Sequence, residues 1–200
     1  MKHLAILVLS LSSVICCAEK RTFSFGSLPT FSENGHLQMV VEIPAGTNKK
    51  IEYEYSSNTF PVTKKSGADR IISFLPYPGN YGFIPSTLMD PDKGGDGDAL
   101  DILLISEHLK ISTVVEVLPI AILLLDDNGA HDYKIIAIPT DETKQIISLA
   151  SCRESRPECI KAKSLIKQWF LAYKGDSLME FNGWGGEDQA RSQIRKWSLK

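Results

Sequence analysis

The chain has few of the residues that mark specialised classes of protein. Its four histidines are scattered and its four cysteines do not alternate with them, so a zinc site is poorly supported. The net charge of −2 lacks the basic excess expected of a nucleic-acid-binding protein. The sequence contains no internal repeat and no low-complexity stretch. A hydrophobic fraction of 43% and a charged fraction of 23% over 200 residues indicate an ordinary globular domain.

One long apolar run is present, at the N-terminus, and it is too short for a comfortable transmembrane span. Lys2 and His3 precede the apolar residues Leu4–Leu9, and the apolar character, with interspersed serines, ends before Ala18. This order is typical of a secretory signal peptide, so we expect residues 1–18 to be cleaved. Residues 19–200 would then form a single domain. The alternative is an ordinary buried N-terminal helix.

Export would place the mature chain in the periplasm or outside the cell. The loss of Lys2 would lower its net charge to −3. Lipid anchoring through Cys16 or Cys17 is less favoured, because Val14 and Ile15 fit a lipobox poorly.

The two remaining cysteines, Cys152 and Cys159, lie close together in the sequence. An oxidising compartment favours a disulfide between such a pair. Two free thiols are the alternative, so the disulfide is a prediction that depends on export.

The hydrophobic pattern changes along the chain from short strands to longer helices. Apolar or alternating segments predict strands at residues 39–43, 50–55, 71–75, 102–105, 114–125 and 133–138, with a break at Pro119. Residues 76–85 read as a structured loop. Helical spacing predicts helices at 141–150, 158–173 and 186–197, the second with an apolar face of Ile160, Leu165, Ile166, Trp169 and Phe170. Strands followed by helices indicate an α+β domain with a barrel-like sheet.

A cluster of carboxylates is the strongest chemical signal. Asp96, Asp98 and Asp101 lie within six residues, just before an apolar strand. On a regular strand Asp101 would face away from the other two, but a turn through Gly97 would let all three converge. Crowded carboxylates repel unless cations neutralise them, and oxygen ligands suit magnesium, manganese or calcium. The loop fits an EF-hand poorly in either frame, and a solvated acidic loop is the alternative reading.

Further charged and phenolic residues gain meaning only in combination. Asp127 and Asp132 lie in a segment with the pattern of a hairpin turn, and Glu42 and Glu52 lie in predicted strands. Basic side chains match phosphate oxygens, and the candidates are Lys50, Arg70, Lys134 and Lys174. Tyrosine hydroxyls are further possible donors, at Tyr77, Tyr81 and Tyr173. Each of these residues alone is more often a surface charge or a packing residue.

The order of these residues resembles the soluble family I inorganic pyrophosphatases from Val41 to about Trp184. Asp96 to Asp101 is similar to the family's Asp-x-Asp-Pro-x-Asp motif, with Ala99 in place of the proline. Other segments resemble its first strands, its arginine segment, its Asn-Tyr-Gly loop, its second acidic segment and its Tyr-Lys pair, at residues 40–52, 66–70, 78–82, 127–134 and 173–174. Asn128 departs from the glutamate of many members.

The resemblance implies hydrolysis of pyrophosphate to two orthophosphates with Mg²⁺, or with Mn²⁺ or another divalent ion. Asp96, Asp101 and Asp132 would hold the first metal ions. Glu52 and Asp127 would hold ions that arrive with the substrate. Catalytic roles fall to Asp98, which accepts a proton from or orients the attacking water, and to Glu42, which orients the basic residues. The residues that bind the substrate would be Lys50, Arg70, Tyr81, Lys134, Tyr173 and Lys174.

The same resemblance implies a closed five-stranded, OB-like β-barrel with flanking α-helices. It also implies a homo-oligomer, with a hexamer favoured and a dimer possible. No membrane span and no nucleic-acid partner are expected.

Two other classes of function remain open from the sequence. The acids suit a non-catalytic calcium- or magnesium-binding module, which phosphate release from pyrophosphate would exclude. An oligonucleotide-binding barrel needs a basic groove with exposed aromatic residues, and the charge of the mature chain argues against it. No aromatic shelf for a base is evident, so kcat/KM for pyrophosphate is expected to exceed that for ATP at least about 100-fold.

Overall fold

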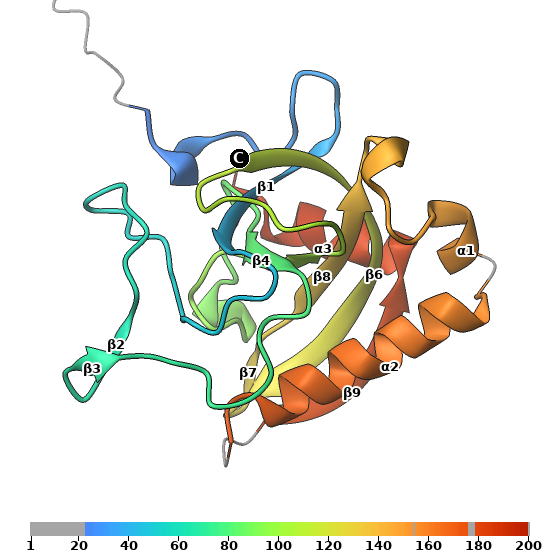
Figure 1. Ribbon diagram of the computed structural model, residues 1–200. Coiled ribbons are helices and arrows are strands. Elements are labelled where there is room, and N and C mark those ends of the chain that lie inside the picture. Colours follow the sequence, from blue (N-terminus) through green and yellow to red (C-terminus); the bar gives the residue numbers. More distant parts are fainter. Residues whose placement is uncertain (1–22, 154, 176–178, 200) are drawn as a thin grey trace, which may run out of the picture.

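The computed structural model describes residues 23–153, 155–175 and 179–199, and the predicted signal peptide lies outside these ranges (Figure 1). Five strands pair in a ring in the order β1 (Leu37–Ile43), β4 (Asn80–Phe83), β5 (Asp101–Leu104), β8 (Lys134–Pro139) and β6 (Val114–Asp127), and β6 pairs again with β1. The pair β5–β8 is parallel, and the other four pairs are antiparallel. The ring and its few helices confirm the predicted α+β, OB-like fold.

The other elements of the described residues are short strands and 3-10 turns, the strand β9 and three α-helices. In order they are η1 (Phe25–Ser27), β2 (Lys64–Lys65), β3 (Ala68–Asp69), η2 (Pro91–Lys93), β7 (Ala130–His131), η3 (Glu142–Lys144), α1 (Leu149–Arg153), α2 (Pro157–Ala172), β9 (Met179–Gly186) and α3 (Glu187–Trp197). In the described part of the chain, no helix is both long enough and apolar enough to cross a membrane.

Strand β6 organises the sheet and runs on through the position where a break was expected. Its first residues pair with β1 as far as Val117, and its pairing with β9 begins at Ala121. Pro119 lies between these two pairings, and the register with β8 shifts there. A proline is tolerated at such an irregular position because the ladder does not require its missing N–H. The strand therefore bends instead of ending.

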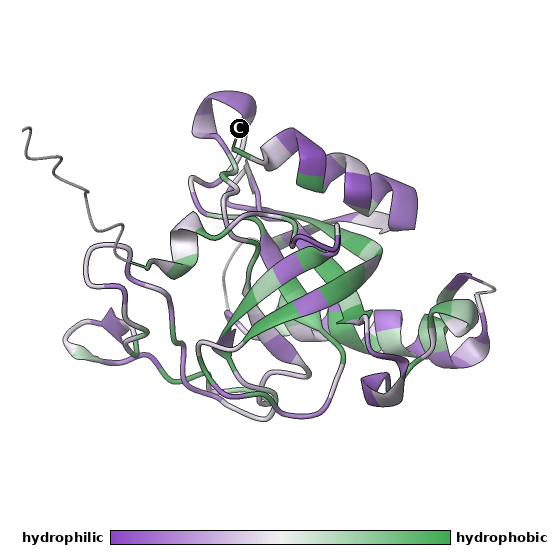
Figure 2. Ribbon diagram, turned by 90° about the horizontal axis from the view of Figure 1, so that it is seen from above, coloured by the Kyte–Doolittle hydropathy of each residue, from purple (hydrophilic) through white to green (hydrophobic). Residues whose placement is uncertain are grey.

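Both faces of the sheet are buried, which is why its strands are almost continuously apolar. One core cluster joins the sheet to Trp169 and Phe170 of α2, and another joins it to Ile194 and Trp197 of α3. Figure 2 shows the ring of strands as mainly hydrophobic and the outer helices as mixed. The rigid sheet and α2 therefore form a frame on which polar side chains can be fixed.

The predicted apolar face of α2 is right for three residues and wrong for two. Ile166, Trp169 and Phe170 are buried, whereas Ile160 is 55% exposed and Leu165 is 72% exposed. A helix turns by about 100° per residue, so Ile160 and Leu165 lie on opposite flanks of the buried stripe. The apolar residues of α2 therefore extend beyond the surface that the sheet covers.

Several predicted element boundaries are corrected by the structure. Residues 50–55 and 71–75 form only isolated bridges, such as Ile51 with Val62, and no continuous ladder. The helix expected at 141–150 is instead η3 followed by α1, since Asp141 caps a short turn by accepting from the N–H of Thr143. The loop expected at 76–85 contains β4, and β9 had no sequence prediction.

Strand β4 escaped prediction because its glycine marks a close approach rather than a turn. A Cβ atom on Gly82 would lie 1.9 Å from the carbonyl oxygen of Val40 on the neighbouring strand. Glycine in a strand often has this function. The Asn-Tyr-Gly segment is thereby fixed inside the sheet, with Asn80 and Tyr81 buried.

The predicted disulfide is confirmed. Cys152 in α1 and Cys159 in α2 are bonded, and their Cα atoms are 5.3 Å apart. The disulfide ties the short helix α1 to the first turn of α2.

Candidate active site

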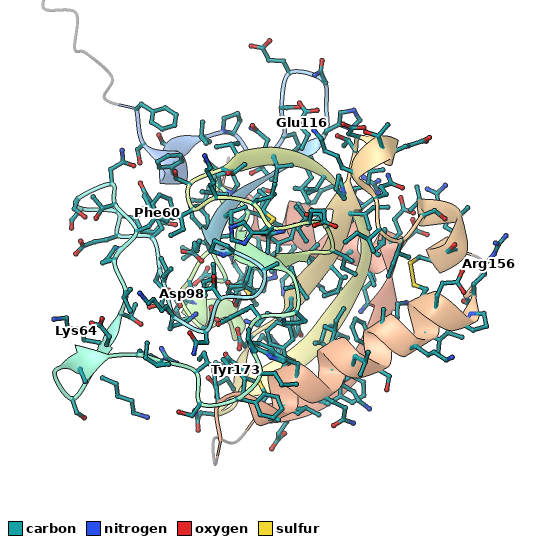
Figure 3. All side chains as sticks on the ribbon, in the orientation of Figure 1. Phe60, Lys64, Asp98, Glu116, Arg156 and Tyr173 are labelled. Carbon is teal, nitrogen blue, oxygen red and sulfur yellow. A yellow bond between two sulfur atoms is a disulfide. The ribbon has the colours of Figure 1, made fainter. Side chains whose placement is uncertain are left out.

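The thirteen residues predicted to form the site all line a single cavity of about 470 Å³. Among its lining residues are seven acids, four cations and two tyrosines: Glu42, Glu52, Asp96, Asp98, Asp101, Asp127, Asp132, Lys50, Arg70, Lys134, Lys174, Tyr81 and Tyr173. Figure 3 labels Asp98, from the loop before β5, and Tyr173, just after α2. Side chains far apart in the sequence therefore meet at one place.

The acidic loop converges through the turn that the sequence suggested. Gly97 has a φ of +92°, a backbone conformation that favours glycine. The N–H of Asp98 donates to Oδ1 of Asp96 at 3.0 Å, and Asp101 begins β5. The turn therefore brings Asp96, Asp98 and Asp101 into the same cavity.

The parallel pairing of β5 and β8 sets the centre of the site. Asp101 and Lys134 are register partners. The buried ammonium group of Lys134 donates to Asp101 and Asp132, and the hydroxyl of Tyr81 also donates to Asp101. Burial alone would lower the pKa of Lys134, but Asp101 and Asp132 hold it well above its usual value. Lys134 is therefore a permanent buried cation.

A hairpin supplies the second acidic segment, and the residues just after α2 supply a cation beside it. Asp127 ends β6, and Asn128 and Gly129 have φ values of +52° and +87°, as a two-residue hairpin turn requires. The ammonium nitrogen of Lys174 lies 2.5 Å from Oδ2 of Asp127 and 3.8 Å from Oδ2 of Asp132. The predicted hairpin is confirmed.

Glu42, Lys50 and Glu52 occupy another wall of the cavity. The carboxyl group of Glu42 is buried on β1 and accepts from the N–H of Tyr53 at 2.7 Å. Its burial raises its pKa to about 8. Lys50 forms a 3.0 Å ion pair with Glu52, and its N–H bonds to the carbonyl of Arg70. Glu42 lies on a regular strand as predicted, whereas Glu52 does not.

The sequence reasoning missed part of the lining. Tyr53, Tyr55, Phe83 and Ala99 also line the cavity, whereas Tyr77, considered as a donor, packs in the core against Trp169 at 4.5 Å between ring centres. The alternation of Ile51 with the two tyrosines indicates a buried face, but nothing in it indicates that the face reaches the cavity.

Comparisons with known proteins agree with this geometry. The sequence model described as "Inorganic pyrophosphatase" matches residues 39–200. The inorganic pyrophosphatase of Sulfolobus acidocaldarius is 35% identical over 164 residues, which span 80% of this chain and 87% of that protein. The chain belongs to the inorganic pyrophosphatase family.

Relatives and solved structures extend the match. The inorganic pyrophosphatase of Brucella melitensis is 34% identical over 179 residues, covering 86% of this chain and 91% of the relative. The crystal structure of the Thermus thermophilus inorganic pyrophosphatase superposes with a TM-score of 0.68 at 29% identity, covering 86% of this chain and 95% of that one. The crystal structure of the Toxoplasma gondii type I inorganic pyrophosphatase superposes with a TM-score of 0.74 at 27% identity, covering 87% of this chain and 85% of that one.

Membership of the inorganic pyrophosphatase family implies a divalent metal, and the donor set fits one. The acids offer hard oxygen ligands, and neither histidine nor cysteine lines the cavity. In the described ranges no three such side chains are placed as a ready metal cluster. Lysines form ion pairs with Asp101, Asp127 and Asp132. Burial and the charges of Asp101 and Asp132 raise the pKa of Asp96 to about 6, so this site favours added positive charge.

Proposed function

We propose that this protein is a Mg²⁺-dependent inorganic pyrophosphatase, which hydrolyses pyrophosphate to two orthophosphates. The observation that carries the proposal is the meeting of all thirteen predicted residues in one cavity. Family membership over residues 39–200 supports the same reaction. Pyrophosphate is small and highly charged, and a lining of cations and metal-binding acids can match most of its surface.

The acids divide between metal binding and proton transfer. Asp96, Asp101 and Asp132 would hold the first divalent ions, and Glu52 and Asp127 would hold ions that enter with the substrate. When bound, such ions neutralise the substrate and lower the pKa of water. The oxygen-only donor set suits Mg²⁺ and also admits Mn²⁺.

Asp98 is the group assigned to proton transfer. Burial, and then the charge of Asp101, raise the pKa of Asp98 above the usual value of an aspartate. A carboxylate with a raised pKa is a better proton acceptor at neutral pH. Asp98 would therefore accept a proton from the water that attacks phosphorus, or orient that water.

The basic residues and tyrosines would bind the substrate and stabilise the charge on the leaving phosphate. They are Lys50, Arg70, Tyr81, Lys134, Tyr173 and Lys174. Lys134 and Lys174 already contact the acids, so they can hold phosphate oxygens close to the metal ligands. Glu42 lies within electrostatic reach of Lys50 and would orient the basic residues.

Phosphate release from pyrophosphate tests the proposal. The purified chain is assayed with Mg²⁺ and again with excess chelator. We expect turnover that depends on the metal and returns when Mg²⁺ is restored. Tight metal binding without phosphate release would instead indicate a non-catalytic binding module.

We also propose that residues 19–200 act as a single exported domain. The N-terminal sequence pattern supports export, and a disulfide suits an oxidising compartment. Identification of the first residue of the mature protein tests cleavage after Ala18. A mature chain that begins at Met1 would contradict it.

We further propose a homo-oligomer, with a hexamer favoured and a dimer as the alternative. The resemblance to the family supports it, as do the exposed apolar side chains of Ile160 and Leu165 on α2. Sedimentation of the purified protein measures the state. A monomer at micromolar concentration would contradict the proposal.

A further inference from the structure

One wall of the cavity takes no part in the proposed metal and phosphate chemistry. The aromatic residues Tyr53, Tyr55 and Phe83 line it. The rings of Tyr53 and Phe83 are stacked with centres 5.3 Å apart, and the ring of Tyr55 meets that of Tyr53 at 4.7 Å. Phe60, labelled in Figure 3, packs on the same group, with its ring centre 5.2 Å from that of Tyr53. A charged cavity therefore has one aromatic side.

Tyr55 is the member of this wall whose ring is open. It is 61% exposed, whereas Tyr53 is 8% exposed and Phe83 is 3% exposed. Partial burial, and then the charges of Glu42, Tyr53 and Asp98, raise the pKa of the Tyr55 hydroxyl. The phenol therefore stays neutral and lies within electrostatic reach of the acid assigned to proton transfer.

The N-terminal segment holds the ring from its other side. A Cβ atom on Gly26 would lie 2.3 Å from Cε1 of Tyr55, so the ring packs directly on this glycine. Asn58 ties the segment down by accepting from the N–H of Phe25 at 3.2 Å. This segment precedes the region that matches the family, residues 39–200. The support of Tyr55 is thus an addition outside that region.

The cavity has room for more than its phosphate-binding groups require. Its volume of about 470 Å³ lies within the range of roughly 300–1,000 Å³ found for pockets that hold drug-sized ligands. Cations and acids make up most of the lining, and the open ring of Tyr55 borders them. A ligand with a polyphosphate at one end and a planar ring at the other matches this arrangement.

We propose that Tyr55 is a specificity-determining residue that stacks on the base of nucleoside polyphosphates and so admits a second substrate class. The inference rests on the proposed function, because the same acids and cations would act on the anhydride. In ATP, the water oxygen bonds to the terminal phosphorus as the bond from that phosphorus to the bridging oxygen breaks. ADP and orthophosphate leave, and Asp98 accepts the released proton. Pyrophosphate remains the better substrate.

The test compares kcat/KM for ATP, inorganic tripolyphosphate and pyrophosphate in the wild type and in Tyr55→Ala. Stacking of a base on an aromatic side chain corresponds to a factor of about 10 in binding. The ratio of kcat/KM for ATP to kcat/KM for pyrophosphate should therefore fall about 10-fold in Tyr55→Ala. The ratio of tripolyphosphate to pyrophosphate should not change, because tripolyphosphate has no base. Tyr55→Phe keeps the ring and should retain the wild-type ratio for ATP.

Three further variants separate the stacking ring from a general effect on folding. Gly26→Ala keeps the tyrosine at position 55 but displaces its ring. This variant should also lower the ratio of kcat/KM for ATP to kcat/KM for pyrophosphate. Gly186→Ala is the matched control, because a Cβ atom there has nothing within 4 Å. Phe74→Ala removes another half-exposed aromatic ring, from outside this cavity, and should leave the ratio unchanged.

The possible failures are distinct. An ATP ratio that stays constant in Tyr55→Ala, or a tripolyphosphate ratio that falls equally, overturns the role of the ring. A wild type that hydrolyses pyrophosphate but not ATP overturns it as well. A wild type without activity on pyrophosphate overturns the proposed function instead.

Discussion

The buried ammonium group of Lys134 lies between the carboxylates of Asp101 and Asp132 and donates a hydrogen bond to each. Asp101 and Lys134 are register partners in the parallel pair of the ring, β5–β8, so the backbone fixes this contact. The same two acids are the proposed ligands of the first divalent ions. Lysine and metal thus neutralise one cluster of negative charge together.

Replacement of Lys134 should make stability depend strongly on metal. Lys134→Met removes the cation between the partly buried Asp101 and the buried Asp132. Removal of one partner from such a buried pair typically costs about 3–5 kcal/mol. Unfolding by urea with and without Mg²⁺ measures the effect. The variant should lose stability in chelator and recover more of it on addition of Mg²⁺ than the wild type gains. Lys64→Met, at an exposed position, is the control, and an equal metal response in both variants would contradict the account.

Glu42 should make the free energy of unfolding fall as pH rises. Its burial raises its pKa from 4.5 to about 8 in the folded protein, so between these values the folded state binds a proton that the unfolded state has released. In chelator, the stability of the wild type relative to Glu42→Gln should fall from pH 5 to pH 8 by an amount on the order of a few kcal/mol. Parallel stability curves for the two proteins would refute the assignment.

The disulfide should add a modest stability. Closing so short a loop contributes about 2–3 kcal/mol in the chain-entropy model. Cys152→Ser and the reduced wild type should therefore be less stable by similar amounts. Intact mass before and after reduction checks the bond itself, and two freely alkylated thiols in the unreduced protein would show that it is not formed.

The acidic site could be predicted because its signals are local. Asp96, Asp98 and Asp101 share one loop, and Gly97 permits the turn that joins them. The ring of strands was harder to predict from the sequence. Strand β6 runs through Pro119, and β4 contains a glycine that the close approach of Val40 requires. In both strands, pairing with a neighbouring strand outweighs the local preference of proline or glycine for a turn.

The role of Tyr55 could not be predicted for a related reason. Residues 50–55 alternate like a strand, yet they form isolated bridges, so the direction of each side chain depends on the loop. The ring is positioned by Gly26, 29 residues earlier in the chain. Such a contact between distant loops leaves no periodic pattern in the sequence.

The most direct test of the central claim is the initial rate of phosphate release from pyrophosphate by Asp101→Asn at saturating Mg²⁺. Asp101 lines the cavity and accepts hydrogen bonds from Lys134 and Tyr81. Loss of its charge should weaken metal binding and water activation together. We expect a rate at least about 100-fold below that of the wild type, with the fold retained by circular dichroism. Asp92→Asn, an exposed aspartate in η2 outside the cavity lining, should keep the wild-type rate. Near-native turnover in Asp101→Asn would contradict the account.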